Sequence, residues 1–410
     1  MLRLYNSLTR EKELFRTLKR DKVLIYVCGI TPYDTTHLGH AFTYMFFDVL
    51  VRYLTFNGYK VNYTQNVTDI DDDIVKKAKE EKKDWKKLGD FWTKIFLSDM
   101  KSLNVLPPTH FVKATDSIEK MIEIINVLLK KGLAYKTHST SSGQAGGNVY
   151  FDVGKFKKYG RLSKFNKKQM ILVSKERGAD PNDPLKKNPL DFILWQGHKA
   201  NEPSWPFDSA QGKEKGRPGW HIECSAMANR FLGRRIDIHG GGKDLIFPHH
   251  ESEIAQSESY AGESPFVRYW MHTAMVLYNG EKMSKSLGNL IMIEDLLTKY
   301  SPNAIRWMIL SHCYRHPWEF EEKELHACED YIREVATALK QINKVSIRKI
   351  KADIYLKDFI CAMNDDLDTP KVLQLILKAA KRIQREKNKS NIKELQEVLK
   401  TIITALGLKL

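Results

Sequence analysis

A buried strand that leads through a turn and a helix into a second strand is the feature that most constrains this fold. Residues 23–30 form a short apolar run rich in β-branched side chains, which predicts a buried strand. Apolar residues then recur at helical spacing and stop at Asn57-Gly58, a helix C-terminal signal. An alternating segment from Tyr59 onward predicts the next strand. This order predicts a βαβ unit, whose parallel sheet binds ligands at the carboxyl ends of its strands.

The rest of the sequence predicts more than one domain, because 410 residues exceed one ordinary core. A helical stretch over 74–133, broken at Pro107-Pro108, leads into a Gly/Ser-rich hairpin region and a Lys-rich, turn-rich insertion over 155–218. Order returns at Trp220, with a predicted helix, strand, helix and strand, and finally a basic loop. After Trp318 nearly every segment suits a helix, which predicts a helical bundle of roughly 90 residues.

These segments define the predicted architecture, an α/β protein in which a connective insertion splits a Rossmann-type parallel sheet and an all-helical bundle follows. The predicted boundaries are 1–110 and 219–317 for the two halves of the sheet domain, 111–218 for the insertion and 318–410 for the bundle.

Composition limits the class of protein and its partners. The formal net charge is +16, which suits a polyanionic partner, although a Lys-biased proteome gives the same number. Five scattered cysteines do not form a disulfide framework. No run approaches the roughly 20 apolar residues of a membrane span, and the charged N-terminus lacks the apolar core of a signal peptide. We therefore expect a cytoplasmic protein, and we expect a monomer.

The first chemical motif, Thr35-Thr36-His37-Leu38-Gly39-His40, lies where the first strand leads into the helix. A helix N-terminus offers free N–H groups and a positive dipole end to phosphate, and Gly39 allows close approach to the backbone. Two imidazoles three residues apart share a helical face and can donate hydrogen bonds to phosphate oxygens in a transition state. Taken alone, the pattern more often marks a polar helix start with two surface histidines.

The second motif is Lys282-Met283-Ser284-Lys285-Ser286, in the predicted basic loop. Two lysines beside small hydroxyl residues can neutralise charge that develops on a triphosphate as pyrophosphate leaves. A solvated basic loop is the alternative, and it is common in a Lys-rich chain.

The third constellation has the composition of a metal site. Cys28 ends the first predicted strand, Cys224 follows the segment from Gly219, and His249 and Glu253 are four residues apart on one predicted helix. Two thiolates, an imidazole and a carboxylate form a competent zinc shell. The residues alone leave a second interpretation open, since buried cysteines usually serve packing and a His-His-Glu sequence on a helix is often exposed.

The two phosphate motifs together resemble the signatures of class I aminoacyl-tRNA synthetases. His37-Leu38-Gly39-His40 is similar to their "HIGH" sequence, and Lys282–Ser286 matches their "KMSKS" sequence letter for letter. The segments around Cys28, Cys224 and His249 resemble cysteinyl-tRNA synthetases over residues 20 to about 320. This resemblance implies an ATP-dependent ligase that makes cysteinyl-adenylate and transfers cysteine to tRNA-Cys.

The resemblance also implies roles for individual residues. It assigns catalysis to His37, His40, Lys282 and Lys285 and ATP contacts to Gly39, His40, Gly241, Asp244 and Lys285. It assigns cysteine binding to Cys28, Gly29, Thr68 and Trp220 and one zinc ion to Cys28, Cys224, His249 and Glu253, with Mg2+ accompanying ATP. The Gly240-Gly241-Gly242 segment can equally serve only to form a tight turn instead of contacting ATP. Trp220 can equally be a core residue instead of a cysteine-binding one. The acidic segment 66–73 resembles the family's polar strand end, without individual roles.

Two features leave the acceptor open. The chain ends soon after the predicted bundle, where cysteinyl-tRNA synthetases usually continue into a small anticodon-reading module. In this, and around 29–34 and 365–370, it also resembles the mycothiol cysteine ligase, which acts on a glucosaminyl-inositol amine. Glu253 and the basic bundle favour tRNA. A catalytically silent RNA-binding paralogue is the third alternative, although it would carry damaged signatures.

Overall fold

The computed structural model describes residues 1–33, 36–137, 144–145, 147–207, 214–283, 287–341, 353–386 and 389–410. The central element is a five-stranded parallel sheet in the order β13-β12-β3-β4-β5. Its strands are β3 (Lys22–Ile30), β4 (Lys60–Val67), β5 (His110–Lys113), β12 (Ile236–Gly242) and β13 (Val267–Thr273). The pairing of β12 with β3 joins segments more than 200 residues apart in sequence into one sheet.

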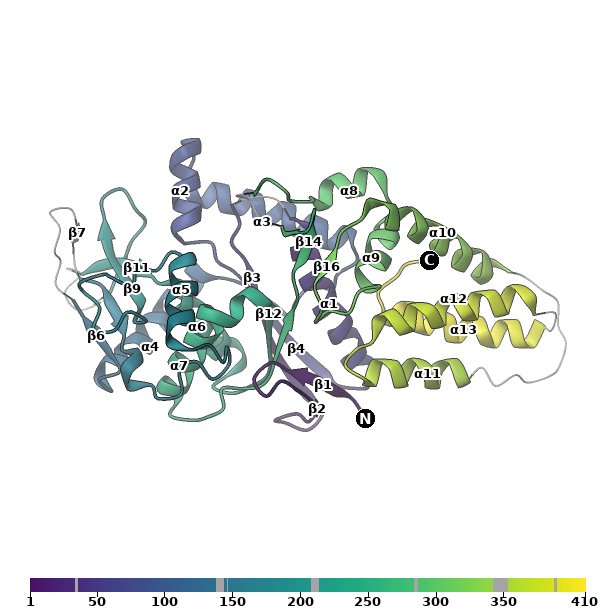
Figure 1. The fold of residues 1–410 in the computed structure, drawn as a ribbon, viewed down its shortest axis with the longest axis horizontal. Helices are drawn as coiled ribbons and strands as arrows, with labels where there is room; N and C mark the ends of the chain where they lie inside the picture. Colours follow the sequence, from purple (N-terminus) through teal and green to yellow (C-terminus); the bar gives the residue numbers. More distant parts are fainter. Residues whose placement is uncertain are drawn as a thin grey trace.

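Helices cover both faces of this sheet, which makes it doubly wound (Figure 1). On one face lies α1 (Leu38–Phe56), whose Phe47 side chain fills the space that a Cβ at Gly240 would take. On the other face lies α6 (Trp220–Leu232), which packs against β3, β4 and α7 (Glu251–Ala261). The predicted Rossmann-type sheet is confirmed.

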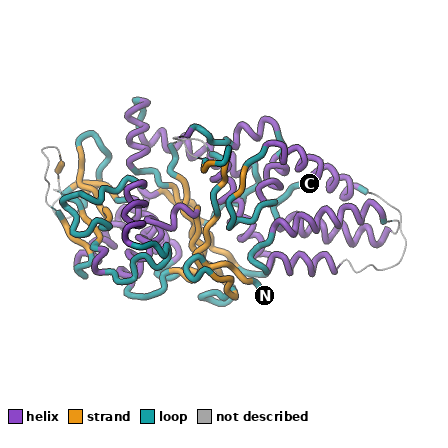
Figure 2. The backbone as a smooth tube through the Cα atoms, in the orientation of Figure 1, coloured by secondary structure: helices purple, strands orange, loops and turns teal. Residues whose placement is uncertain are grey.

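A second, antiparallel sheet interrupts the first and lies at the opposite end of the molecule from the helical bundle (Figures 1 and 2). Its strands run in the order β10-β11-β9-β8-β6, with β7 paired to β9. Its elements are β6 (Ala134–Lys136), β7 (Gln144–Ala145), β8 (Val149–Phe151), β9 (Phe192–Lys199), β10 (Trp205–Pro206) and β11 (Lys215–Pro218), with helices α4 (Ile118–Lys130) and α5 (Lys167–Glu176).

The helical end of the molecule contains α10 (Glu322–Lys340), α11 (Asp353–Asn364), α12 (Thr369–Arg385) and α13 (Lys389–Ala405) (Figure 2). The predicted helical domain is confirmed. The remaining elements are the hairpin β1 (Arg3–Asn6) and β2 (Glu11–Leu14), the helices α2 (Asp72–Glu81), α3 (Trp85–Ser102), α8 (Ile293–Lys299) and α9 (Pro302–Leu310), and the small sheet of β14 (Val276–Tyr278), β15 (Glu281–Lys282) and β16 (Trp318–Glu319). Within the described residues, none of these helices is long and apolar enough to cross a membrane.

Two local predictions were wrong. The stretch 74–133 is not helical throughout, because β5 follows the predicted break at Pro107-Pro108 and pairs with β4. Four residues next to a helical pattern carry too short a signal to be recognised as a strand. The predicted helix that carries His249 and Glu253 also begins later than expected, since Phe247 is extended and α7 begins only at Glu251.

A buried ion pair fastens the chain's C-terminal segment to the parallel-sheet domain. Arg306 of α9 is 1% exposed and pairs with Asp48 of α1, which is equally buried. The same guanidinium donates to the carbonyl of Leu406 at 2.5 Å and to that of Leu103 at 3.0 Å. The bundle's last helix is therefore held by the helix that begins at His37-Leu38.

We predict that Asp48→Ala lowers the free energy of unfolding by roughly 3–5 kcal/mol, because it leaves the Arg306 charge buried without its carboxylate. Denaturant unfolding followed by circular dichroism measures this loss. As control, Lys12→Ala breaks the exposed pair with Asp365 and should cost less than about 1 kcal/mol. Equal effects of the two substitutions would contradict the role given to the buried pair.

Candidate active site

The ends of β3 and β4 are locked together by one asparagine. The Asn66 side-chain oxygen accepts a hydrogen bond from the Gly29 amide at 2.8 Å, and Gly29 directly follows Cys28. A Cβ at Gly29 would overlap the backbone carbonyl of Asn66, so no larger residue fits without moving the strands. Asn66 also donates to the Thr68 hydroxyl at 3.2 Å. Cys28, Gly29 and Thr68 thus lie together at the carboxyl edge of the sheet.

Four predicted metal ligands converge at this edge. The sulfurs of Cys28 and Cys224 are 3.7 Å apart, and His249 Nε2 lies 3.4 Å from the Cys224 sulfur. Glu253 Oε1 is 3.2 Å from His249 Nε2 and 3.8 Å from the Cys28 sulfur. All four ligand atoms lie within 4.8 Å of one another, and all four residues are buried. The structure therefore brings them together as a possible metal site, here called the ligand cluster.

Burial shifts the pKa values of the side chains in this ligand cluster toward their neutral forms, and a divalent cation would counteract the shifts of the acidic groups. Burial raises the pKa of the Cys28 thiol well above its usual range, and the neighbouring Cys224 adds to the rise. Burial likewise raises the pKa of Glu253 and lowers the pKa of His249. A bound cation would favour the thiolate, the carboxylate and the neutral imidazole, which are the forms that bind metal.

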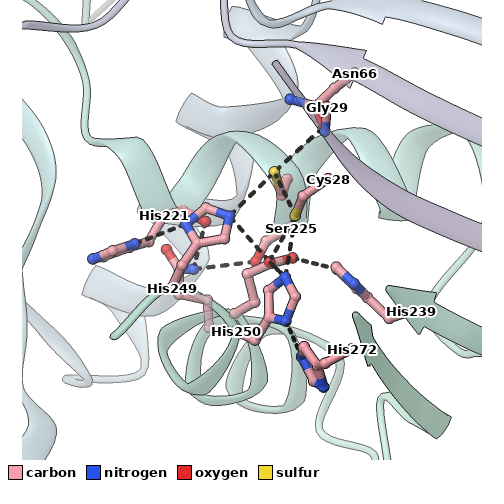
Figure 3. A network of polar contacts seen from close by, with 12 residues as sticks. Cys28, Gly29, Asn66, His221, Ser225, His239, His249, His250 and His272 are labelled. Atoms are coloured by element: carbon pink, nitrogen blue, oxygen red, sulfur yellow. Dashed lines mark hydrogen bonds and ion pairs between the residues drawn. The ribbon is translucent and has the colours of Figure 1, made fainter. Parts of the chain in front are cut away.

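Further histidines hold the ligand cluster in place (Figure 3). His239 Nε2 lies 2.9 Å from Glu253 Oε2, and His221 Nδ1 lies 3.0 Å from His249 Nδ1. His250 Nδ1 lies 2.8 Å from His272 Nε2. Such contacts fix the orientation of a ligand and its hydrogen-bonding nitrogen.

A second set of donors shares part of the ligand cluster. Cys28, His239, His250 and Glu253 also place their ligand atoms within 4.8 Å, and His250 Nε2 lies 3.2 Å from the Cys28 sulfur. This set holds one sulfur where the predicted set holds two. Because a second thiolate favours soft and borderline metals, the donor chemistry favours the predicted set for zinc.

His249 reaches the ligand cluster from a different backbone than expected. It lies in a wide turn, Ile246–His250, immediately before α7, and the four-residue spacing to Glu253 still directs both side chains inward. Trp220, at the start of α6, stacks on the His249 ring with centroids 4.4 Å apart. This contact places the indole beside the ligand cluster.

The first helix begins at the predicted phosphate motif. His37 caps α1 by accepting from the Gly39 amide at 3.1 Å, and its ring stacks on His40 with centroids 3.7 Å apart. The Leu38 amide donates to the carbonyl of Ile291 at 2.8 Å. The helix N-terminus thus touches the segment that follows the predicted basic loop.

Asp244 joins the Gly-rich turn to that basic loop. Its Oδ2 lies 3.5 Å from the Lys282 ammonium, and Gly241 is the second-to-last residue of β12, which ends shortly before Asp244. Lys285, with Ser284 and Ser286, lies outside the described residues, as does Thr35. The described residues therefore place Lys282, Asp244 and Gly241 together and say nothing of Lys285.

Asp71 belongs to the acidic segment 66–73, for which no individual roles were predicted. It caps α2 by accepting from the Ile74 amide at 2.9 Å. Burial raises its pKa to about 7, and the nearby Asp73 adds to the rise. His221, His239, His250 and His272, all buried, were missed as well.

The chain matches the model of the tRNA synthetases class I (C) catalytic domain over residues 14–330 and that of the DALR domain over 358–410. It is 42% identical to a cysteine--tRNA ligase of Methanococcus maripaludis, covering 94% of this chain and 80% of that protein. It is 45% identical to a cysteine--tRNA ligase of Thermodesulfovibrio yellowstonii, with 96% and 81% covered.

Solved class I synthetases share the fold at low sequence identity. Methionyl-tRNA synthetase of Mycobacterium tuberculosis in complex with methionyl-adenylate has a TM-score of 0.66 at 14% identity, over 94% of this chain and 89% of that one. A leucyl enzyme of Agrobacterium radiobacter, solved with tRNA, has a TM-score of 0.67 at 10% identity, over 96% and 84%.

We predict that Asp71→Asn becomes more stable relative to wild type as pH rises from about 4 to 7. Because the folded-state pKa of Asp71 is raised, the native protein binds a proton there that the unfolded chain has lost, so wild-type stability falls across this window. Asparagine caps a helix equally well and carries no charge. Urea unfolding midpoints of the variant and of wild type at about pH 4 and pH 7 measure the stability difference. A stability difference that does not change with pH would contradict the raised pKa of Asp71.

Proposed function

This chain belongs to the cysteine type of class I tRNA synthetases, and we propose that the candidate active site activates cysteine with ATP and transfers it to tRNA-Cys. It is an ATP-dependent ligase like the relatives that it matches at 42–45% identity over nearly its whole length. The carrying observation is the ligand cluster, in which Cys28 near the end of β3 meets Cys224 of α6 at the edge of the sheet where α1 also begins.

In the first step the cysteine carboxylate attacks the α-phosphate of Mg-ATP, forming a P–O bond as pyrophosphate leaves. His37, His40, Lys282 and Lys285 stabilise the charge that develops on the phosphate oxygens. Gly39, His40, Gly241, Asp244 and Lys285 position the nucleotide. The support is the helix N-terminus at His37 and the bond between Asp244 and Lys282. Positioning and charge stabilisation carry the rate without a covalent enzyme intermediate.

Cysteine binds beside the ligand cluster, where Gly29, Thr68 and Trp220 surround it. Zinc held by Cys28, Cys224, His249 and Glu253, one ion per chain, would accept the substrate's thiolate in preference to the hydroxyl of serine. The support is the buried, mutually adjacent donor set and the Trp220 ring stacked on His249. Discrimination by a site built for one polar group can be steep enough to need no editing.

In the second step a hydroxyl of the tRNA's terminal adenosine attacks the cysteinyl carbonyl, and AMP leaves. We assign residues 1–110 and 219–317 to the catalytic domain, 111–218 to its insertion and 318–410 to a tRNA-contacting bundle. A cavity of about 480 Å3 between α11 and α12 supports the last assignment, because Lys378, Lys381, Arg382 and Arg385 line it.

The direct test is cysteine- and ATP-dependent acylation of a tRNA-Cys transcript, with glucosaminyl-inositol as a parallel acceptor. We expect the tRNA to be charged and the amino sugar to remain unmodified. Lys282→Ala should lower cysteine-dependent pyrophosphate exchange by about a hundredfold, since one transition-state donor is lost.

The matched control is Lys299→Ala, which removes an exposed lysine paired with Glu322 and should leave exchange unchanged. Transfer of cysteine to the amino sugar alone would show that tRNA is not the acceptor, while the proposed adenylation step would remain supported. Unchanged exchange in Lys282→Ala would contradict the role of this lysine.

Removal of one sulfur tests the metal ligands. Purified wild type should carry one zinc ion per chain, and Cys224→Ala should lose it on dialysis. His239→Ala should weaken zinc affinity by about 10–100-fold, because in the predicted donor set His239 orients the Glu253 carboxylate and is not itself a ligand. Atomic emission and chelator competition measure both, with exposed Cys361→Ala as control. Full zinc in Cys224→Ala together with its loss in His239→Ala would favour the second donor set.

A further inference from the structure

A buried carboxylate beside the ligand cluster has no role in the reaction steps above. Glu223 precedes Cys224 directly on α6 and is 0% exposed. Among the described residues, no hydrogen-bond donor reaches either oxygen of its carboxylate. Because a buried charge without a partner is costly, such a carboxylate points to a cationic ligand from outside the chain.

The surroundings of Glu223 place it near the end of β4. Consecutive helical residues diverge by about 100° around the axis, so Glu223 and Cys224 project in different directions. The Cys224 sulfur lies 3.7 Å from Asn66 Oδ1. Burial raises the pKa of Glu223 well above its usual range, and the neighbouring Cys224 and Asp71 add to the rise. The Thr68 side chain acts in the opposite direction on this pKa, from beyond the normal length of a hydrogen bond.

The other buried carboxylates at this edge of the sheet already have partners. Asp69 accepts from the Thr115 amide at 3.0 Å and from the Thr115 hydroxyl at 2.7 Å. Asp71 caps α2, and Glu253 belongs to the ligand cluster. Of these four carboxylates, only Glu223 has both oxygens without a hydrogen-bond partner among the described residues.

The proposed substrate brings a cation to this position. In cysteine only two carbon atoms separate the ammonium nitrogen from the sulfur. When the substrate's sulfur lies at the ligand cluster, its ammonium group must therefore lie close by, near Thr68. A buried ammonium group needs a counter-charge, and a hydrogen bond between ammonium and carboxylate is among the stronger ones that proteins form.

We propose that Glu223 binds the α-ammonium group of the cysteine substrate through its carboxylate oxygens. This contact holds the substrate at a second point besides its sulfur and leaves its carboxylate free to face the α1 N-terminus. It also makes the site select an α-amino acid over other small thiols, a choice that recognition of sulfur alone does not provide. The inference rests on the proposed function, because it assigns a further residue to the recognition of the same substrate.

The test compares two thiols on the full-length, zinc-loaded protein by isothermal titration calorimetry: cysteine, and 3-mercaptopropionate, which has no ammonium group. Wild type should bind cysteine about 10–100-fold more tightly, the effect of one charged hydrogen bond. Glu223→Gln should remove most of this preference by weakening cysteine alone, whereas Glu223→Asp keeps the charge and should retain more of it. In pyrophosphate exchange, Glu223→Gln should raise the KM for cysteine and leave the KM for ATP unchanged.

The matched control is Glu258→Gln, which removes another buried carboxylate, on α7. Glu258 accepts from the Phe266 amide at 3.1 Å and pairs with Arg161, so its partners belong to the chain itself. This variant should keep the wild-type ratio of the two thiol affinities. Zinc content measured by atomic emission shows whether each variant retains the metal site.

Three results would overturn the inference. Equal affinities of wild type for the two thiols would show that the ammonium group has no partner in the site, and this measurement needs no variant. Equal weakening of both thiols by Glu223→Gln would assign Glu223 to the support of the metal site. An unchanged preference in Glu223→Gln would assign the ammonium group to another residue. In all three cases, charging of tRNA by wild type would leave the proposed function standing, whereas failure of wild type to bind either thiol would remove both.

Discussion

The parallel pairing of β3 with β12 is the constraint on which the rest of the structure depends. Ile25, Tyr26 and Val27 pair with Ile238, His239 and Gly240, so two remote segments end at the same edge of one sheet. Cys28 follows directly on one side, and the turn that carries His249 follows on the other. The pairing needs a glycine at 240, because the Phe47 ring of α1 occupies the space of a side chain there. The strands between β5 and α6 form a separate antiparallel sheet.

Burial determines the protonation states of the ligand cluster. Burial raises the pKa of the Cys28 thiol and of the Glu253 carboxyl group, which favours their protonated forms, and lowers the pKa of His249, which favours its neutral form. Contacts with His239 and His221 satisfy part of the polar atoms, and a bound cation would stabilise the deprotonated sulfurs. A soft metal held there would distinguish a thiol from a hydroxyl by the softness of sulfur, where shape alone would discriminate poorly.

Much of this could be predicted from the sequence, for physical reasons that differ between residues. The apolar run at 23–30 and the helical spacing after it predicted the βαβ unit, because burial imposes those periods. The candidate ligands Cys28, Cys224, His249 and Glu253 were predicted from residue type and a family resemblance, and the structure brings their ligand atoms within 4.8 Å of one another. The strand β5 and the late start of α7 were not predictable, since each depends on pairing or bending that short segments do not encode. Contacts such as His250 with His272 join elements that only the folded sheet brings together.

The most direct measurement replaces the metal with cobalt and records the visible absorption spectrum as cysteine or serine is added. Cobalt takes the same ligands as zinc and gives a sulfur-to-metal absorption band for each thiolate that binds it. We predict that cysteine adds intensity to this band and that serine does not, because only a thiolate would bind the metal as an additional donor. An unchanged spectrum with saturating cysteine would contradict recognition of the substrate by its sulfur.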